Sequence, residues 1–408
     1  MIFPFLKKQD SSASNSSKKK HYVILYNQGG GMRGLIPAHI MSYIEQKTGL
    51  RMAEMVDIFA GPSTASILNA ALTRPSRHHP DRPMFRARNL VRFYESEGTS
   101  IFPPDRFRAF RGIIHDFNNR TLKLGQLNSI MRHGHYNPAD LQKPLKKLLG
   151  QTRIHDTLKS LIIPAYNIDS DQLTVAAEID EQDTSPAPTK NNFMDQGGHA
   201  VWFKHIDISE GLLPVKKYTP NVLLYDAVMA SCAAPTFFPC HHMNMETEEN
   251  GPIRNYSMID GQIYDNACIS YLGAIRRHLP KDASFTMIVL GTGYTNYSIK
   301  KEDWNRYGSL GIVDPVNDFP LINIFFHASE SALMDTFAEE IGDNLHIFNK
   351  SLLKSESGKG LPNQQIDDAS PENLQRLENF SKAIIEENQS QFDNMCEILT
   401  RNYDSQQK

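Results

Sequence analysis

The stretch FAGPSTA, residues 59–65, places a serine in a tight turn between two segments of different character. Residues 55–59 before it are apolar and typical of a short buried strand, whereas residues 67–72 have the alanine and leucine content of a helix. A serine at such a turn lies at the top of a sheet and near a helix N-terminus, which stabilises developing negative charge. The stretch therefore predicts either a nucleophile elbow centred on Ser63 or a serine that caps a core helix.

Length and composition bound the possible classes. The 408 residues suffice for one large α/β domain or two smaller ones, and 40% hydrophobic with 22% charged residues is ordinary for a globular protein. A net charge of −3, without a lysine-rich groove interleaved with aromatics, argues against a nucleic-acid partner. Apolar runs are too short to span a bilayer, and no signal-peptide core is evident. We expect a cytoplasmic protein, with export without a cleaved signal left open.

The fold is expected to begin at His21, and we expect one folded domain over residues 21–390. Residues 1–20 are polar and are expected to be a disordered tail, and residues 391–408 are expected to be a polar C-terminal tail. A last helix is expected to start at Ser370, with Pro371 in its first turn, and to pack on the domain.

Strand-like and helix-like segments alternate within this domain, which predicts an α/β fold with a largely parallel sheet. Two other segments, 181–199 and 242–255, are rich in Pro, Gly, Asn and acidic residues and are interpreted as surface loops. The strand-like segments are 22–26, 161–166, 173–177 and 200–206, and the helix-like segments are 36–47, 141–149 and 225–231.

A glycine-rich turn, Gly29 to Gly34, separates the first strand from the first helix. Consecutive glycines let the backbone approach a ligand and point several N–H groups at one spot near a helix N-terminus. Such a turn binds either the pyrophosphate of a dinucleotide or the oxyanion of a tetrahedral intermediate. The dinucleotide fold needs an acidic residue at the end of a second strand, yet Glu45 falls inside the helix and Glu54 precedes the strand to Ser63. The pattern favours an oxyanion hole.

Asp260 ends a short apolar strand and is followed by Gly261. Alone this pattern is typical of an ordinary turn. Together with Ser63 and the glycine turn, Asp260 becomes a candidate general base that accepts the serine proton and returns it to the leaving group. A histidine base remains an alternative, because α/β-hydrolases place Ser, Asp and His in this chain order and His327 and His346 follow Asp260.

The four cysteines are widely spaced without a C-x-x-C pair, which predicts free thiols. One of them stands in the run Cys240-His241-His242. Adjacent residues rarely converge on one ion, so we expect no metal site there.

With these motifs in place, the sequence resembles the patatin-like phospholipase family from about residue 21 to about residue 385. That family carries a D-G-G-G-x-R-G turn, a G-x-S-x-G elbow and a D-G-G or D-G-A tripeptide in this order. Their counterparts here are Gln28-Gly29-Gly30-Gly31-Met32-Arg33-Gly34, Gly61-Pro62-Ser63-Thr64-Ala65 and Asp260-Gly261-Gln262. Further matching segments are residues 136–138, 163–167, 231–239, 290–293 and 367–374.

The resemblance implies a three-layer α/β/α fold with a mostly parallel central sheet, and a lipid acyl hydrolase of the phospholipase A type. It implies that Ser63 is the nucleophile and Asp260 the general base of a dyad that works through an acyl-enzyme. It also implies a glycerolipid or phospholipid substrate and no metal or organic cofactor. The remaining residues that it assigns are Gly29, Gly30, Gly31, Arg33 and Gly34 at the oxyanion hole, Gly61, Pro62, Thr64 and Ala65 at the elbow, and Gly261 in the dyad loop.

Three residues depart from the family pattern. Gln28 replaces the aspartate before the glycines, Ala65 adds a methyl group at the elbow, and Gln262 replaces the small third residue of the tripeptide, where it could restrict the site or donate a hydrogen bond. A catalytically silent lipid-binding or storage protein with the same fold is therefore the alternative function.

The segment from Arg74 to Arg111 is rich in arginine and interleaves five phenylalanines. It is interpreted either as a face that docks on anionic lipid at a membrane surface, or as a solvated helical face with its phenylalanines in the core. The sequence does not predict an oligomeric state.

Overall fold

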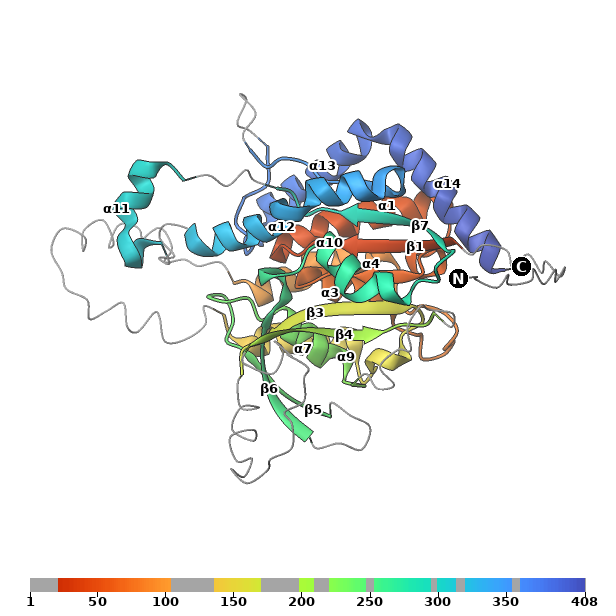
Figure 1. Ribbon diagram of the computed structural model, residues 1–408, viewed down its shortest axis with the longest axis horizontal. Helices are drawn as coiled ribbons and strands as arrows, with labels where there is room; N and C mark the ends of the chain where they lie inside the picture. The colour runs from red at the N-terminus through yellow and green to blue at the C-terminus, as the bar shows by residue number, and fades with distance from the viewer. Residues whose placement is uncertain are drawn as a thin grey trace, which may run out of the picture.

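The computed structural model describes residues 21–103, 136–169, 198–208, 220–246, 253–294, 299–312, 320–353 and 360–407. In this part of the chain an eight-stranded mixed sheet is covered by helices on both faces (Figure 1). This three-layer α/β/α arrangement confirms the predicted fold class. The expected tail over 1–20 and the expected strand over 173–177 lie outside the described residues.

The sheet has a parallel centre and an antiparallel margin. Its order is β5-β6-β3-β2-β1-β7-β8, with β4 also paired to β3. The strands from β3 through β2, β1 and β7 to β8 run parallel, whereas β4 and β6 run antiparallel to β3, and β5 antiparallel to β6. The strands are β1 (His21–Asn27), β2 (Ile58–Ala60), β3 (Ser160–Asn167), β4 (His199–His205), β5 (His241–Glu246), β6 (Ile253–Asp260), β7 (Ser284–Leu290) and β8 (Leu345–Phe348).

Alternate residues of β1 pack into two separate cores, because successive side chains of a strand point to opposite faces. Val23 and Leu25 belong to the larger core and Ile24 to the smaller one. The larger core is covered by α1 (Leu35–Thr48), α3 (Thr64–Thr73), α4 (Ala87–Ile101), α7 (Pro138–Leu149), α9 (Leu224–Ser231), α13 (Pro371–Glu387) and α14 (Gln389–Gln406). The smaller core is covered by α10 (Ala267–Ser270), the π-helical turn η5 (Tyr271–Ile275) and α12 (Pro320–Ile341).

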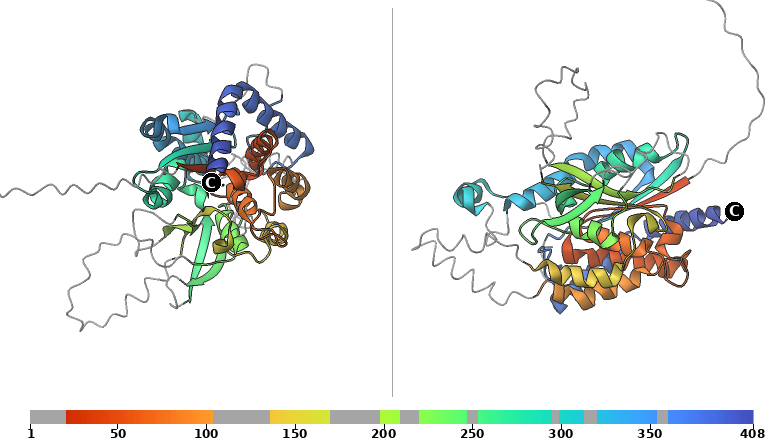
Figure 2. Two further views of the ribbon diagram at one scale, coloured as in Figure 1. Left: turned by 90° about the vertical axis from the view of Figure 1, so that its right-hand side faces the viewer. Right: turned by 90° about the horizontal axis from the view of Figure 1, so that it is seen from below.

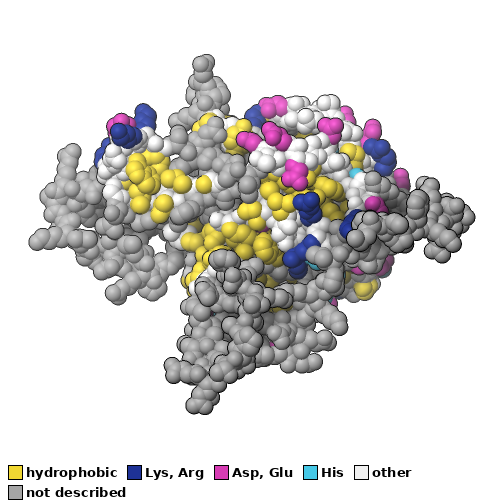
Figure 3. Space-filling model, viewed as in Figure 1, with side chains coloured by type: hydrophobic (Ala, Val, Ile, Leu, Met, Phe, Trp, Pro, Cys, Tyr) yellow, Lys and Arg dark blue, Asp and Glu magenta, His cyan; other side chains and the backbone are white. Residues whose placement is uncertain are grey.

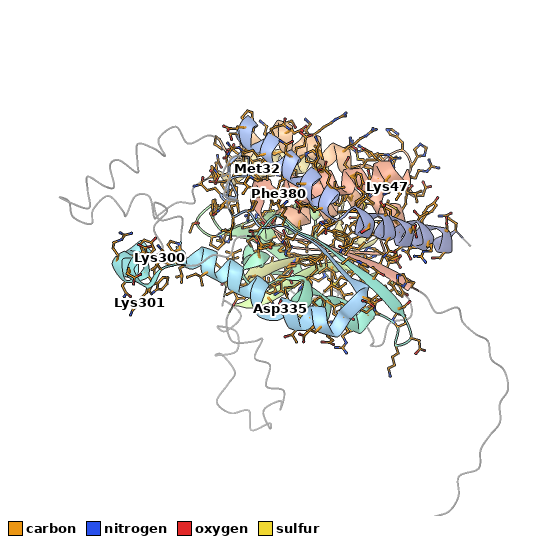
Figure 4. The ribbon with its side chains drawn as sticks, turned by 90° about the horizontal axis from the view of Figure 1, so that it is seen from above. Met32, Lys47, Lys300, Lys301, Asp335 and Phe380 are labelled. Atoms are coloured by element: carbon orange, nitrogen blue, oxygen red, sulfur yellow. The ribbon has the colours of Figure 1, made fainter. Side chains whose placement is uncertain are left out.

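The views perpendicular to Figure 1 show the two layers directly. In the right panel of Figure 2 the sheet lies between α12 and the layer that contains α1 and α3. Figure 4 shows Phe380 of α13 and Asp335 of α12 on opposite sides of the sheet. The glycine turn and the Ser63 turn follow the carboxyl ends of β1 and β2, two inner strands of a sheet that is packed on both faces.

Several local signals predicted the helices correctly. The helix expected over 36–47 is α1, and Gly49 follows its last residue in the left-handed conformation that ends a helix. Ser370 caps α13 by accepting the Asn373 N–H at 3.3 Å, and Pro371 is its first residue. The expected helices over 141–149 and 225–231 are α7 and α9.

The prediction of a polar tail over 391–408 is wrong, because these residues form most of α14. Phe392, Met395 and Leu399 recur on one face of this helix and are buried in the larger core. Asn402 on the same face donates to the Met55 carbonyl at 2.9 Å. Most of the remaining side chains of this helix are polar and exposed, so the composition of the segment is polar although one face is part of the core.

We expect Leu399→Ala to lower the free energy of unfolding by about 2–5 kcal/mol, because it leaves a cavity under a side chain that is fully buried. Chemical denaturation followed by circular dichroism measures this change. Glu397→Ala, at an exposed position of the same helix, is the matched control and is expected to change stability by less than about 0.5 kcal/mol. Equal effects of the two substitutions would contradict the packing of α14.

The interpretation of residues 242–255 as a loop is also wrong for 242–246 and 253–255, since β5 and β6 pair antiparallel from His241 opposite Met258 to Glu246 opposite Ile253, whereas 247–252 lie outside the described residues. Met243 and Met245 are buried and alternate with exposed residues, which is the period of a half-buried strand. The asparagines and acidic residues around them hid this alternation.

A smaller correction concerns the strand before Ser63. The expected strand over 55–59 is shorter and shifted, because Met55 ends the helix α2 (Met52–Met55) and β2 begins at Ile58.

All four cysteines lie in the described residues and are free thiols, as predicted. Within the described ranges, no helix combines the length and apolar character that crossing a membrane requires.

Candidate active site

Ser63 stands at a strained turn between β2 and α3. Its backbone has φ 55° and ψ −131°, a conformation that is rare for any residue with a side chain and clusters at functional sites. Gly61 before it has φ 144°, and a Cβ there would overlap the Asn27 carbonyl oxygen and lie 2.8 Å from the Ala65 Cβ. The turn therefore requires glycine at 61, and the buried methyl group of Ala65 is accommodated against it.

The Ser63 side chain does not cap α3. It forms no capping hydrogen bond with the first turn of the helix, although it occupies the N-cap position. Its hydroxyl is instead hydrogen-bonded to the Asp260 carboxylate. This contact favours the nucleophile interpretation over that of a helix-capping serine.

The register of β3 explains why residues so distant in sequence meet. Because β4 occupies one edge of β3 along residues 161–167, β2 and β6 share the other edge. Ala60, the last residue of β2, pairs with Ile162, and Asp260, the last residue of β6, pairs with Ala165. The two strands thus approach each other end to end, with Ser63 and Asp260 at their facing ends.

A hydrogen-bond relay holds the serine backbone in the gap between these strands. The Ser63 N–H donates to Ser231 Oγ at 2.9 Å, and the Ser231 hydroxyl donates to the Pro164 carbonyl at 2.5 Å. Ser66 Oγ donates to the Ser63 carbonyl at 2.6 Å. Pro164 lies between the residues of β3 that pair with β2 and those that pair with β6. Proline has no backbone N–H, and at this position none is needed to bind a neighbouring strand.

Asp260 is 1% exposed and lies at the start of the short helix η4 (Gly261–Ile263). Its Oδ1 accepts the Gln262 N–H at 2.8 Å, and its own N–H donates to the Ala233 carbonyl at 3.0 Å. Burial raises the pKa of Asp260 to about 7, while the hydrogen bonds from Ser63 and from the Gln262 N–H act in the opposite direction. A carboxylate with a pKa close to neutrality is well suited to accept and return a proton.

The glycine turn lies directly beside the serine. A Cβ on Gly29 would lie 3.1 Å from the Ser63 Cβ, so the two residues are in contact. The N–H groups of Gly29, Gly30 and Gly31 donate to no acceptor among the residues that the structure describes, which leaves them available to an oxyanion.

Contacts from two later segments hold this turn. The Ile366 carbonyl accepts the Met32 N–H at 2.7 Å and lies where a side chain on Gly31, at φ 56°, would be. Thr292 Oγ1 donates to the Gly29 carbonyl at 2.7 Å. These two contacts fix the backbone of the turn.

The other predicted site residues support the turn and the elbow. The Arg33 N–H donates to the Gly30 carbonyl at 3.1 Å and closes the 3₁₀ turn η1 (Gly31–Gly34). Gly34 lies against Thr64, whose hydroxyl is hydrogen-bonded to Tyr94. The Pro62 carbonyl accepts the Ala65 N–H at 3.0 Å, which starts the first turn of α3.

Gly261 completes the dyad loop. A Cβ on this residue would overlap the Pro164 carbonyl, so the loop packs closely on β3.

Sequence reasoning assigned no role to several residues that hold the site. Asn349 Nδ2 donates to Gln28 Oε1 at 3.1 Å, so the glutamine that replaces the family's aspartate is anchored by another amide. Ser231 and Thr292 lie in segments that resemble the family, and this resemblance was the sequence signal that could have identified them. Ile366 acts through its backbone carbonyl, which no side-chain pattern reveals.

Of the two histidines proposed as alternative bases, His346 is not placed at the dyad. His346 lies in β8 opposite Ile288 of β7, and β1 and β7 separate β8 from β2. His327 lies in α12, with its side chain outside the described part. The hydrogen bonds to the Asp260 carboxylate come from Ser63 and Gln262.

The run Cys240 to His242 has other partners than an ion. His242 Nδ1 is hydrogen-bonded to Ser257 Oγ at 3.0 Å, and His241 Nε2 pairs with Asp226 at 3.2 Å. In the part of the chain that the structure describes, no three metal-ligating side chains gather around one point.

The phenylalanines of the arginine-rich segment belong to the core as far as the structure describes them. Phe93 is buried, and Phe85 and Phe102 are partly buried against the same core. Phe107 and Phe110 lie outside the described residues.

A family model described as patatin-like phospholipase matches residues 27–272. The chain belongs to this family. Ser63, Asp260 and the glycine turn all fall inside the match, whereas β7, β8 and α12 to α14 follow it. Membership in the patatin-like phospholipases supports lipid acyl hydrolase activity in general.

Relatives with the same family name cover most of the chain. Patatin-like protein 1 of Oryza sativa subsp. indica is 25% identical over 381 residues, which cover 88% of this chain and 79% of the relative. Patatin-01 of Solanum tuberosum is 24% identical over 381 residues, covering 88% and 82%. Among solved structures, human GIVD cytosolic phospholipase A2 in complex with methyl gamma-linolenyl fluorophosphonate aligns with a TM-score of 0.39 and 9% identity, covering 94% of this chain and 59% of that one.

Proposed function

We propose that this protein is a phospholipase A-type acyl hydrolase that releases fatty acids from glycerolipids by a Ser63–Asp260 dyad. The observation that carries the proposal is the hydrogen bond from a serine at a strained elbow to a buried carboxylate whose pKa is about 7. The N–H groups of the adjacent glycine turn, which donate to none of the described residues, supply the third part of the machinery.

Acylation follows from this arrangement. Ser63 Oγ attacks the ester carbonyl carbon while Asp260 accepts its proton, and the N–H groups of Gly29 to Gly31 stabilise the oxyanion of the tetrahedral intermediate. The intermediate collapses when Asp260 returns the proton to the oxygen of the leaving alcohol. The fatty acid remains as an ester on Ser63.

Deacylation repeats these steps with water. Asp260 accepts a proton from the water that attacks the acyl-enzyme, and the oxyanion forms in the same glycine turn. Asp260 then protonates Ser63 Oγ as the fatty acid leaves. Each step uses the two side chains and the backbone donors already described, and the proposal requires no cofactor.

We also propose that the protein is cytoplasmic. It would contact membranes peripherally, because its proposed substrates lie in bilayers. Figure 3 shows hydrophobic side chains over α11 (Lys301–Gly311), together with both basic and acidic side chains. Trp304 of this helix is 38% exposed and is followed by the exposed Arg306. Aromatic and basic side chains on one helix suit the boundary between water and lipid head groups.

The test is fatty acid release from phospholipid vesicles and from a water-soluble ester by the wild type and by Ser63→Ala. Release by the wild type that depends on Ser63 supports the hydrolase. Release from no substrate, or equal release by both proteins, would instead favour the catalytically silent lipid-binding or storage protein.

The raised pKa of Asp260 predicts a pH dependence. The base must be ionised, so kcat/KM is expected to rise with pH and to fall about tenfold for each pH unit below about 7. A profile on the soluble ester measures this midpoint. Asp265 is also buried with its pKa raised to about 7, and Asp265→Asn is the matched control that should leave the midpoint unchanged. A midpoint that moves with Asp265 would contradict the assignment of Asp260 as the base.

A further inference from the structure

Gln262 places a carboxamide at the edge of the active site. Its backbone N–H holds the Asp260 carboxylate, and its side chain extends from η4 to the glycine turn. A Cβ on Gly29 would overlap Oε1 of Gln262 and lie 2.8 Å from its Cδ, while the Ser63 Cβ is 3.1 Å from the same point. The amide, the nucleophile and the oxyanion turn therefore surround one small space.

The Gln262 carboxamide is not used to hold the described part of the structure together. Its Oε1 and Nε2 form no hydrogen bond with any residue that the structure describes, and the side chain is only partly buried. The backbone N–H alone supports Asp260. Removing the side-chain amide would therefore empty space beside Ser63 while leaving the hydrogen bond to the base intact.

The chemistry of the dyad determines which part of the substrate meets this amide. Asp260 must return its proton to the oxygen of the leaving alcohol, so the alcohol lies on the Asp260 side of Ser63. Gln262 starts on that same side, where its backbone N–H donates to Asp260 at 2.8 Å, and its side chain crosses from there to Gly29, past the space beside Ser63. Crowding by Gln262 is consequently felt first at the carbon that carries the ester oxygen of the alcohol.

We propose that the Gln262 side chain makes the enzyme selective for esters of primary alcohols over esters of secondary alcohols. The inference rests on the proposed function, because it concerns the leaving group of the same reaction. In a glycerolipid the outer acyl groups are esters of primary alcohols and the central one is the ester of a secondary alcohol. The outer acyl group is then released first, since the branched central carbon meets the carboxamide.

The test is an intramolecular competition in a phosphatidylcholine that carries palmitate on the outer carbon and oleate on the central carbon. The ratio of the two fatty acids at early conversion reports the selectivity. Because both esters are in one molecule, this ratio does not depend on how much of a variant folds. The lipid with the two chains exchanged controls for acyl-chain preference, and propyl against isopropyl butyrate repeats the comparison without a membrane.

The wild type is expected to favour the outer ester about tenfold, the size of effect that one misplaced carbon has in a binding site. Gln262→Ala should bring the ratio close to one, and Gln262→Met, which keeps the bulk and removes the amide, should retain the preference. Ser63-dependent release without a preference, or a preference that survives Gln262→Ala, overturns this inference and leaves the hydrolase standing. Loss of the preference in Gln262→Met would show that the bulk of the side chain is not its cause and would overturn the inference. Absence of any Ser63-dependent release contradicts the proposed function and this inference with it.

Discussion

Ser63→Ala is expected to lower fatty acid release by about 10⁴- to 10⁶-fold, the loss seen when the nucleophile of a serine hydrolase is removed. The residual rate would come from substrate binding and the oxyanion donors of the glycine turn, which the substitution leaves in place. The measurement is kcat/KM on a soluble ester, where interfacial binding does not limit the rate.

The fold is expected to survive this substitution, because alanine adopts the Ser63 backbone conformation with no greater strain and the Ser63 N–H still donates to Ser231. Ser381→Ala is the matched control, since Ser381 is a buried serine of α13 whose hydroxyl only bonds its own helix. It should retain full activity. A Ser63→Ala protein that is folded and nearly as active as the wild type would refute the dyad.

Asp260→Asn is expected to reduce kcat/KM by about 10³- to 10⁴-fold, because an amide of the same shape cannot accept the serine proton. Asparagine still offers Oδ1 to the Gln262 N–H, so the loop after β6 should keep its conformation. The loss is therefore a loss of proton transfer rather than of structure.

The same substitution is expected to increase stability above neutral pH. Burial raises the pKa of Asp260 above its unfolded value, so the folded state binds a proton more tightly, and the free energy of unfolding falls as pH rises from about 4 to about 7. Asparagine is uncharged, so burying it does not carry this penalty of burying a charge above neutral pH. Unfolding of Asp260→Asn and of the wild type at mildly alkaline pH measures the difference. A variant that is both inactive and clearly destabilised would contradict the assignment.

His346→Ala is the control that separates a dyad from a triad. Because His346 lies on β8, beyond β1 and β7 from the elbow, its loss should leave kcat/KM unchanged. His327→Ala extends the comparison to the other histidine. A severe loss from either substitution would show that a histidine acts as the base.

The sequence predicted the parts of the site that depend on local geometry. A serine at a strand-to-helix turn, consecutive glycines after a strand and an aspartate at a strand end are each local patterns, and the structure brings Ser63, Gly29 and Asp260 together. The relay through Ser231 and Pro164 could not be predicted in this way. It depends on the register of three strands that are distant in sequence.

The errors in the fold have a common physical cause. In α14 and in β5, a minority of apolar side chains is buried while the remaining polar ones face solvent. Composition averaged over such a segment resembles a tail or a loop. The correct signal was the spacing of the apolar residues, which an average over the segment does not show. This spacing is helical for Phe392, Met395 and Leu399, and it is the alternation of a strand for Met243 and Met245.

β2 and β6 meet end to end on one edge of β3, and this arrangement determines which insertions and deletions the active site tolerates. The separation of nucleophile and base is set by two residues of β3, Ile163 and Pro164, and not by the long stretch of chain that joins Ser63 to Asp260. Insertions and deletions in the connecting loops can therefore accumulate without altering the catalytic geometry. A single-residue deletion within β3 would shift one partner strand against the other and separate the pair, and it would also reverse which side chains of this buried strand face each core.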